Sequence, residues 1–133
     1  MKATDLMIGD WVQSFGEPHK IIGIRTDTPY AYIKTDMSDT WYEFGMKDLA
    51  DGISITPEIL EKNYGKETRV GISDNPCWGE LVAMWITMLW KCENSFWLEV
   101  RNTEGGFVKK HIRYVHELQH AMRLCGIEKE IEL

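Results

Sequence analysis

The stretch from Lys109 to Gly126 constrains the fold most, because it contains the clearest amphipathic helix in the sequence. Its apolar side chains recur at helical spacing and fall on one arc, wide enough to bury against a sheet or a second helix. Gly126 predicts a left-handed cap at the end of this helix, and Arg123 suits the negative end of the helix dipole. The residues on the arc are Tyr114, Val115, Leu118, Ala121, Met122 and Cys125.

The start of the helix is less well marked. No Ser, Thr, Asp or Asn precedes the apolar pattern, and Lys109, Lys110 and Arg113 oppose the positive end of the dipole. We therefore expect residues 107–111 to form a strand that runs almost directly into the helix, whose apolar arc then covers the inner face of a sheet.

The same helix carries His116-Glu117-Leu118-Gln119-His120, the only string here that resembles a catalytic signature. Two histidines four residues apart, with a glutamate beside the first, are typical of a zinc-hydrolase helix. In such a site the metal polarises a water molecule, and the glutamate takes its proton. A zinc hydrolase with ligands His116 and His120 and the base Glu117 is therefore one hypothesis.

A catalytic zinc also needs a third protein ligand, and this sequence offers no familiar one. The segment from Ala121 to Gly126 has no histidine, and only 13 residues follow His120. We therefore favour a chain without a metal or cofactor, in which His116 and His120 are neighbours on a half-exposed polar face. The remaining donors would need an unfamiliar arrangement: His19, His111, Cys77, Cys92, Glu128, Glu130 and Glu132.

The formal net charge is -6 over 133 residues, of which 44% are hydrophobic. This length makes one domain, or two small lobes that share a core. The negative charge disfavours a general binder of nucleic acid or anionic membranes. Lys109, Lys110, His111 and Arg113 nevertheless form a local basic cluster, which we interpret as a solvated strand face, with phosphate or nucleic-acid binding as the alternative.

The cysteine count is odd, and the spacing shows no pairs, which indicates free thiols in a reducing compartment. No apolar run approaches the roughly 20 residues of a membrane span, and no charged, apolar leader opens the chain. We therefore expect a soluble, cytoplasmic protein without a membrane partner. The cysteines are Cys77, Cys92 and Cys125.

Residues 1–52 read as several short strands with a turn signal about every 8 to 12 residues. This pattern predicts a small antiparallel barrel of the SH3 type, with strands at 19–25, 30–35 and 41–46. Its aromatic residues are expected to fill a core too small to do without them, and the alternative is a binding groove. They are Trp11, Tyr30, Tyr32, Trp41 and Tyr42.

Residues 53–133 predict a second, α+β lobe. Thr56 is an N-cap, Pro57 occupies the first helical position and Gly65 ends the helix that links the two lobes. After this helix come predicted strands at 68–73, 81–90, 96–101 and 107–111, the long helix, and an edge strand at 128–133. The sequence leaves open whether Trp78, Trp85 and Trp90 are buried or form an exposed interface.

Three segments, 6–12, 55–63 and 114–126, resemble a family of small uncharacterised proteins from gut anaerobes and their phages. Members of that family often carry glutamine at the position of Glu117 and asparagine at that of His120, an exchange that a catalytic base and a zinc ligand would not tolerate. The resemblance implies a phage or mobile-element accessory protein that binds a host or phage macromolecule. We expect a non-enzymatic interaction module, with a candidate surface formed by Trp11, Tyr32, Trp41, Lys109, Lys110 and Arg113.

Overall fold

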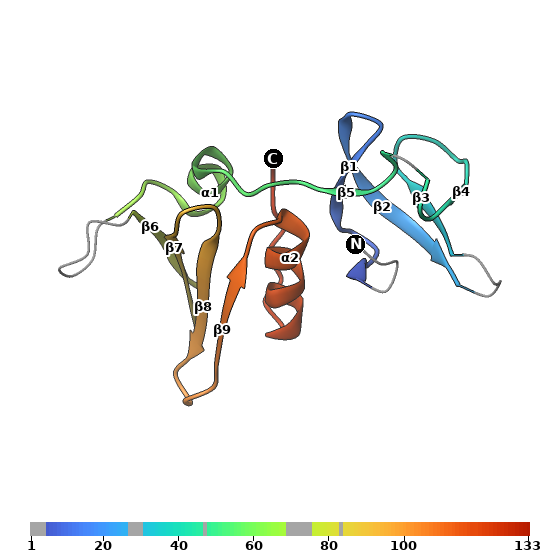
Figure 1. The fold of residues 1–133 in the computed structure, drawn as a ribbon. Helices are drawn as coiled ribbons and strands as arrows, with labels where there is room; N and C mark the ends of the chain where they lie inside the picture. Colours follow the sequence, from blue (N-terminus) through green and yellow to red (C-terminus); the bar gives the residue numbers. More distant parts are fainter. Residues whose placement is uncertain (1–4, 27–30, 47, 69–75, 83) are drawn as a thin grey trace. The chain divides into compact units, whose positions relative to one another are not determined.

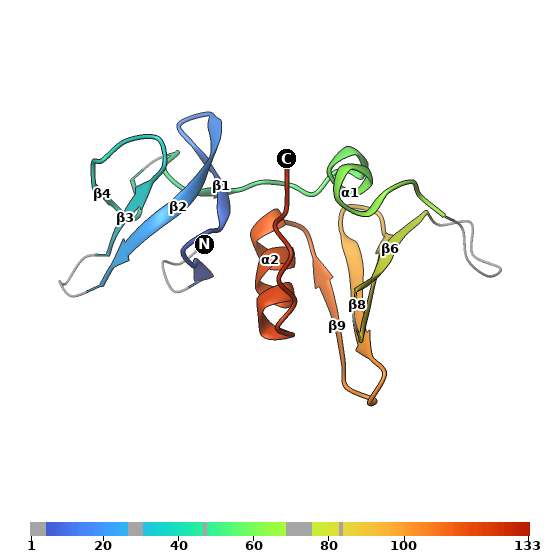
Figure 2. The ribbon, with the colours of Figure 1, turned by 180° about the vertical axis from the view of Figure 1, so that it is seen from behind.

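The computed structural model describes residues 5–26, 31–46, 48–68, 76–82 and 84–133. The chain divides into two compact units, residues 1–53 and 54–133, within one residue of the expected boundary. Two antiparallel sheets and two helices make it an α+β protein (Figure 1). Figure 2 shows from behind that α1 and α2 both belong to the part of the chain after residue 53.

The first unit is an antiparallel sheet in the order β4-β3-β2-β1-β5. β1 and β2 are joined by a two-residue turn in which Phe15 and Gly16 have φ of 50° and 87°, as in a type I′ turn. Between described residues no pairing joins β4 to β5, so the expected SH3-like barrel is not confirmed. The strands are β1 (Trp11–Ser14), β2 (Glu17–Arg25), β3 (Tyr32–Thr35), β4 (Tyr42–Glu43) and β5 (Asp51–Gly52).

The core of this sheet is aliphatic, which corrects the expectation that aromatic side chains fill it. Along β1 and β3 burial alternates, so that Val12 and Ile33 point into the core and Trp11 and Tyr32 point out of it. Trp41 is exposed, and Tyr30 lies outside the described residues. The buried apolar side chains of the unit are Leu6, Val12, Ile21, Ile33 and Leu49.

The second unit is an antiparallel meander in the order β6-β7-β8-β9, with two helices. The single strand expected at 81–90 is wrong, because the chain turns between Val82 and Trp85 and forms a hairpin. Of the strand expected at 68–73, only Thr68 is described, and it bridges to Cys77. The elements are α1 (Pro57–Tyr64), β6 (Cys77–Val82), β7 (Trp85–Lys91), β8 (Phe96–Asn102), β9 (Phe107–Ile112) and α2 (Val115–Leu124).

α1 begins and ends where the sequence predicts, and α2 ends at Leu124, just before the predicted cap at Gly126. The Thr56 side chain accepts a hydrogen bond from the Ile59 backbone at 3.2 Å, and Gly65 ends α1 with φ of 85°. α1 contacts β6 and therefore belongs to the second unit. β9 ends at Ile112 and α2 begins at Val115, which confirms the direct passage from strand to helix.

The edge strand expected at 128–133 is absent, since residues 127–133 form no strand. The Asn63 side chain on α1 instead takes both hydrogen bonds of one residue in this tail. Asn63 Nδ2 donates to the Glu132 carbonyl at 2.7 Å, and Asn63 Oδ1 accepts from the Glu132 amide at 2.8 Å. Ile127 and Ile131 are buried, so the tail packs without a neighbouring strand.

Tyr64, at the end of α1, is buried beside this tail, with Lys129 Nζ 4.7 Å from its ring centroid. Burial raises the pKa of the Tyr64 hydroxyl, and the nearby charge of Glu80 raises it further. No helix in the described part of the chain is both long and apolar enough to cross a membrane.

Candidate interaction surface

Strand alternation sorts the side chains of the second sheet onto two faces. Phe96, Leu98 and Val100 on β8 are buried, whereas Trp97 and Arg101 on the other side of the strand are exposed and Glu99 on that side is buried. The buried side is called the packed face here, and the other side the outer face. By strand register, the outer face comprises Cys77, Gly79, Leu81, Ile86, Met88, Trp90, Trp97, Glu99, Arg101, Phe107, Lys109 and His111.

An apolar row crosses the outer face at the end nearest the β6–β7 and β8–β9 turns. Register pairs Leu81 with Ile86, Ile86 with Arg101, and Arg101 with Phe107, so three apolar residues and the charged Arg101 between Ile86 and Phe107 form one row across the four strands. Leu81, Ile86 and Phe107 are 68%, 40% and 65% exposed. Because large apolar side chains that lie together in solvent mark interaction sites, this row is a candidate binding surface.

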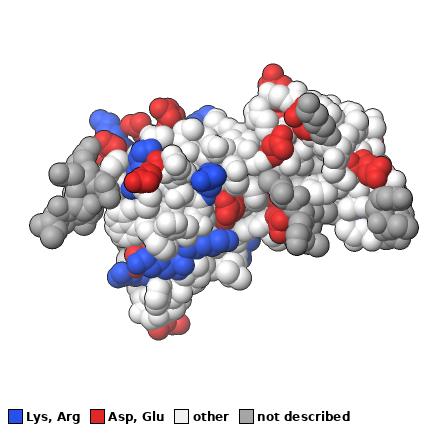
Figure 3. Space-filling model, viewed as in Figure 1, with Lys and Arg blue, Asp and Glu red and all other residues white. Residues whose placement is uncertain are grey.

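Charged groups lie beside the apolar row. The buried Glu99 carboxylate is paired with Arg101 Nε. Lys109 Nζ lies 5.2 Å from the Trp97 ring centroid, and the His111 ring contacts the same tryptophan with its centroid at 3.6 Å. Figure 3 shows lysine and arginine side chains in a band over β8 and β9. The outer face therefore carries one carboxylate that is already paired and an ammonium group whose contact is an aromatic ring.

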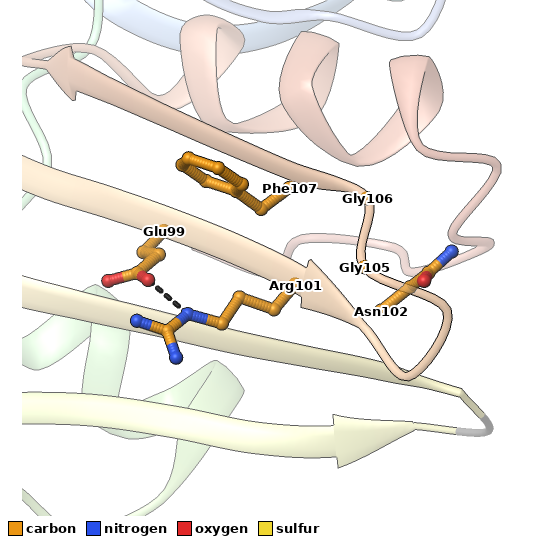
Figure 4. A pocket seen from close by; sticks show the side chains of 6 residues that line it. All are labelled: Glu99, Arg101, Asn102, Gly105, Gly106 and Phe107. Carbon is orange, nitrogen blue, oxygen red and sulfur yellow. Dashed lines mark hydrogen bonds and ion pairs between the residues drawn. The ribbon is translucent and has the colours of Figure 1, made fainter.

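A hollow of about 240 Å³ opens between this charge pair and the apolar row. Figure 4 shows Glu99, Arg101 and Phe107 rising from β8 and β9 on one side of the sheet, beside the turn that contains Gly105 and Gly106. The Arg101 guanidinium lies against the Glu99 carboxylate, to which its Nε donates a hydrogen bond, on the side of Glu99 away from the Phe107 ring. The lining of this hollow thus includes the Glu99–Arg101 pair and the exposed ring of Phe107.

A second hollow, of about 250 Å³, lies along β6 and β7. Gly79 contributes to it, since a Cβ at this position would lie 2.6 Å from the Thr87 carbonyl oxygen. Lys66, Glu80 and Cys77 also line it, and burial raises the pKa of the Cys77 thiol. All three cysteines are free, as expected.

The histidine helix is placed differently from the expectation. His116 is buried rather than half-exposed, and its ring stacks on Tyr114 with centroids 5.7 Å apart and planes 9° apart. His120 meets the His116 ring edge-on, also at 5.7 Å. α2 is thus buried around more of its circumference than its apolar arc alone predicts.

Glu117 caps the N-terminus of α2. Its Oε1 accepts hydrogen bonds from the backbone amides of Arg113 and Tyr114, both at 3.0 Å. This is the glutamate half of a capping box, and it satisfies two amides that the helix itself cannot. In the part of the chain that is described, no group of three or more His, Cys, Asp or Glu residues is arranged to hold a metal ion.

The six residues of the expected interaction surface are divided between the two units, with Trp11, Tyr32 and Trp41 in the first and Lys109, Lys110 and Arg113 in the second. Lys109 lies on the outer face, but Lys110 points to the opposite side because neighbours in a strand alternate. In the first unit, Trp11 is covered by Lys20 at 5.1 Å, and Trp41 by Arg25 and Lys34 at 5.5 Å and 5.7 Å. Sequence reasoning missed Leu81, Ile86 and Phe107: the first two were assigned to one strand where the chain forms a hairpin, whereas the strand of Phe107 was predicted with nearly its observed limits.

The fold and this surface define a two-unit α+β protein that presents an exposed sheet face. No family model, curated protein or solved structure matches the chain.

Proposed function

We propose that this protein is a non-enzymatic interaction module and that the outer face of the second sheet binds a macromolecule. The exposure of Leu81 and Phe107 in one row carries the proposal. Fully burying a side chain of this size stabilises a complex by roughly 1.5 to 3 kcal/mol. Strands paired on both sides hold Ile86 and Arg101 of this row in place, so binding costs little ordering of the backbone.

The role of Glu117 supports a binding function over the zinc-hydrolase alternative. A carboxylate oxygen that accepts two backbone amides is engaged in the fold, whereas a general base needs its oxygen directed at a water molecule. We further propose the phage or mobile-element accessory role that the resemblance implies. For the first unit we keep an SH3-like assignment as a proposal, because its last strand pairs with its first, as in small barrels.

Site-specific photocrosslinking in the cells that express the protein tests the binding function. A photoreactive amino acid replaces Leu81 in one variant and Leu124 in a control, since Leu124 is 78% exposed and lies on α2. We expect one discrete macromolecular adduct from position 81 and none from position 124. The crosslinked partner is then identified, and its affinity for the unmodified protein is compared with its affinity for the Leu81→Ser variant. Equal adducts from both positions, or none from either, would refute the proposal.

A further inference from the structure

We infer that the tail, residues 127–133, exchanges between two copies of this chain, so that each copy binds the tail of the other where its own tail lies. The tail site is defined here by Asn63 and Tyr64 on α1 and Glu80 on β6. The dimer is reciprocal, because each chain supplies one tail and one tail site. These residues are not part of the outer face, so the inference does not rest on the proposed function.

The tail is an extended segment whose side chains alternate between the protein and the solvent. Ile127, Lys129 and Ile131 are buried or half-buried, and the glutamates between them are exposed. Residues 127–133 form no strand, so the backbone of the tail is not paired into either sheet. Binding of an extended segment through alternate side chains is a common mode of peptide recognition. The second unit therefore holds its tail as it would hold a peptide ligand.

The side chains that bind the tail precede it in the chain. Asn63 binds both the amide and the carbonyl of Glu132, at 2.8 Å and 2.7 Å. Lys129 Nζ lies 3.0 Å from a Glu80 carboxylate oxygen and 4.7 Å from the Tyr64 ring centroid. Each of these contacts joins one atom of the tail to one atom of the tail site. A tail from a second copy can therefore make the same contacts.

A single glycine returns the tail to its own chain. Gly126 has φ of 73°. The Gly126 amide donates to the Arg123 carbonyl at 3.0 Å, and the Ile127 amide donates to the Met122 carbonyl at 2.9 Å. This is the Schellman pattern, which reverses the chain after α2. When Gly126 adopts a right-handed or extended conformation instead, the reversal is lost and the tail leaves its own site without any change in that site.

The exchange depends on protein concentration. A segment joined through a short hinge faces its own site at an effective concentration on the order of 1 mM. Because the contacts are the same within one chain and between two, a second copy competes only when its concentration approaches that value. The wild-type chain should therefore be monomeric at micromolar concentration and should exchange tails at millimolar concentration.

Gly126→Ala tests the hinge by sedimentation of the full chain. A Cβ at position 126 meets no atom within 4 Å, so its cost is confined to the left-handed backbone of the closed form. That cost is about tenfold for each hinge. A reciprocal dimer opens both hinges, so its dissociation constant should fall about a hundredfold, to roughly 10 µM.

Gly105→Ala is the matched control for the hinge variant. Gly105 also has a left-handed φ, 96°, and a Cβ there also meets no atom within 4 Å, but it lies between β8 and β9. We expect this variant to leave the dissociation constant of the dimer within about twofold of wild type. An equal effect of the two variants, or no dimer of Gly126→Ala up to about 1 mM, would overturn the inference.

Nuclear Overhauser effects between isotope-labelled and unlabelled chains identify the segment that is exchanged. Chains with Gly126→Ala, and in parallel wild-type chains, are mixed at about 1 mM, and only contacts between a labelled and an unlabelled chain are recorded. We expect a contact between the Tyr64 ring and the Lys129 side chain, since Lys129 belongs to the tail. The contact between Tyr64 and Met122 should be absent, because both residues precede the hinge. Both contacts together, or neither, would overturn the inference.

Discussion

The tryptophans of the first unit differ from the two most exposed apolar side chains of the second sheet in what lies against them. In the first sheet, Trp11 and Trp41 lie under the chain's own cations, and Trp41 also rests on the backbone of Gly23. In the second sheet, Leu81 and Phe107 stand in solvent at 68% and 65% exposure. An exposed aromatic ring is therefore a poor guide to a binding surface by itself, because a cation from the same fold can already occupy its face.

The largest expected effect compares the two faces of the second sheet. Leu98→Ala on the packed face should lower the free energy of unfolding by about 2 to 5 kcal/mol, because its side chain is fully buried. Leu81→Ala on the outer face should change it by at most about 0.5 kcal/mol. Urea denaturation of the full chain measures both. A similar cost for the two variants would show that the outer face is covered in solution.

Gly23→Ala tests whether Trp41 is held within the first sheet. The added Cβ would lie 2.7 Å from the Trp41 ring, so the ring must move away from Arg25 and Lys34. We expect a loss of about 1 to 3 kcal/mol in the free energy of unfolding. The same change in a Trp41→Ala background should cost much less. Equal costs in the two backgrounds would mean that the ring does not rest on Gly23.

Substitutions at Asn63 test whether its two hydrogen bonds to Glu132 hold the C-terminal tail in place. Asn63→Ala removes both hydrogen bonds to Glu132 and should lower the free energy of unfolding by about 1 to 2 kcal/mol. Asn63→Asp keeps the acceptor for the Glu132 amide but directs a carboxylate oxygen at the Ile59 and Glu132 carbonyls, so its effect on stability should be at least as large. Hydrogen exchange at the Glu132 amide should quicken more in the alanine variant. Unchanged exchange would show that the tail is held by Ile127 and Ile131 alone.

Glu117 separates helix capping from catalysis. Glutamine can accept the same two amide hydrogen bonds, so Glu117→Gln should change the free energy of unfolding by only a few tenths of a kcal/mol. Glu117→Ala should lower it by about 1 kcal/mol. Metal analysis of protein purified without a histidine tag provides the control. Stoichiometric zinc that His120→Ala removes would contradict the capping interpretation and restore the hydrolase.

Tyr64→Phe should have the smallest effect at neutral pH. The hydroxyl makes only a 3.9 Å contact with Met122 sulfur, which predicts a change below about 1 kcal/mol. Above pH about 10 the unfolded tyrosine loses its proton while the folded one keeps it, since burial raises the folded pKa. Wild-type stability should therefore fall more steeply with rising pH than that of the variant. Parallel pH profiles would contradict the burial of this hydroxyl.

Local signals predicted local structure well. Thr56, Pro57 and Gly65 fixed both ends of α1, and alternation gave the two faces of β8. The turn between β6 and β7 escaped prediction because no Gly, Pro, Asn or Asp occurs from Leu81 to Trp85. The tail reads as a strand, but its hydrogen bonds go to Asn63, and no local pattern encodes that contact across 69 residues.

The candidate surface was predicted only in part, since of the residues expected for it in the second unit Lys109 alone lies on the outer face. The basic cluster read from the sequence joins neighbours that a strand separates onto opposite sides. Conversely, Leu81 and Phe107 are 26 positions apart in the sequence, and four-strand register brings them into one row. Register is a long-range property, so spacing along the chain could not reveal this surface.

The position of β9 at the end of the second sheet has a consequence for how the protein behaves in concentrated solution. The backbone N–H and C=O groups on its free edge have no neighbouring strand among the described residues. An edge of this kind can pair with a strand of another molecule. Lys109 and Lys110 place a positive charge on each side of that edge, so two approaching β9 strands repel each other. Acetylation of both lysines should therefore turn a dispersed protein into one that assembles edge to edge.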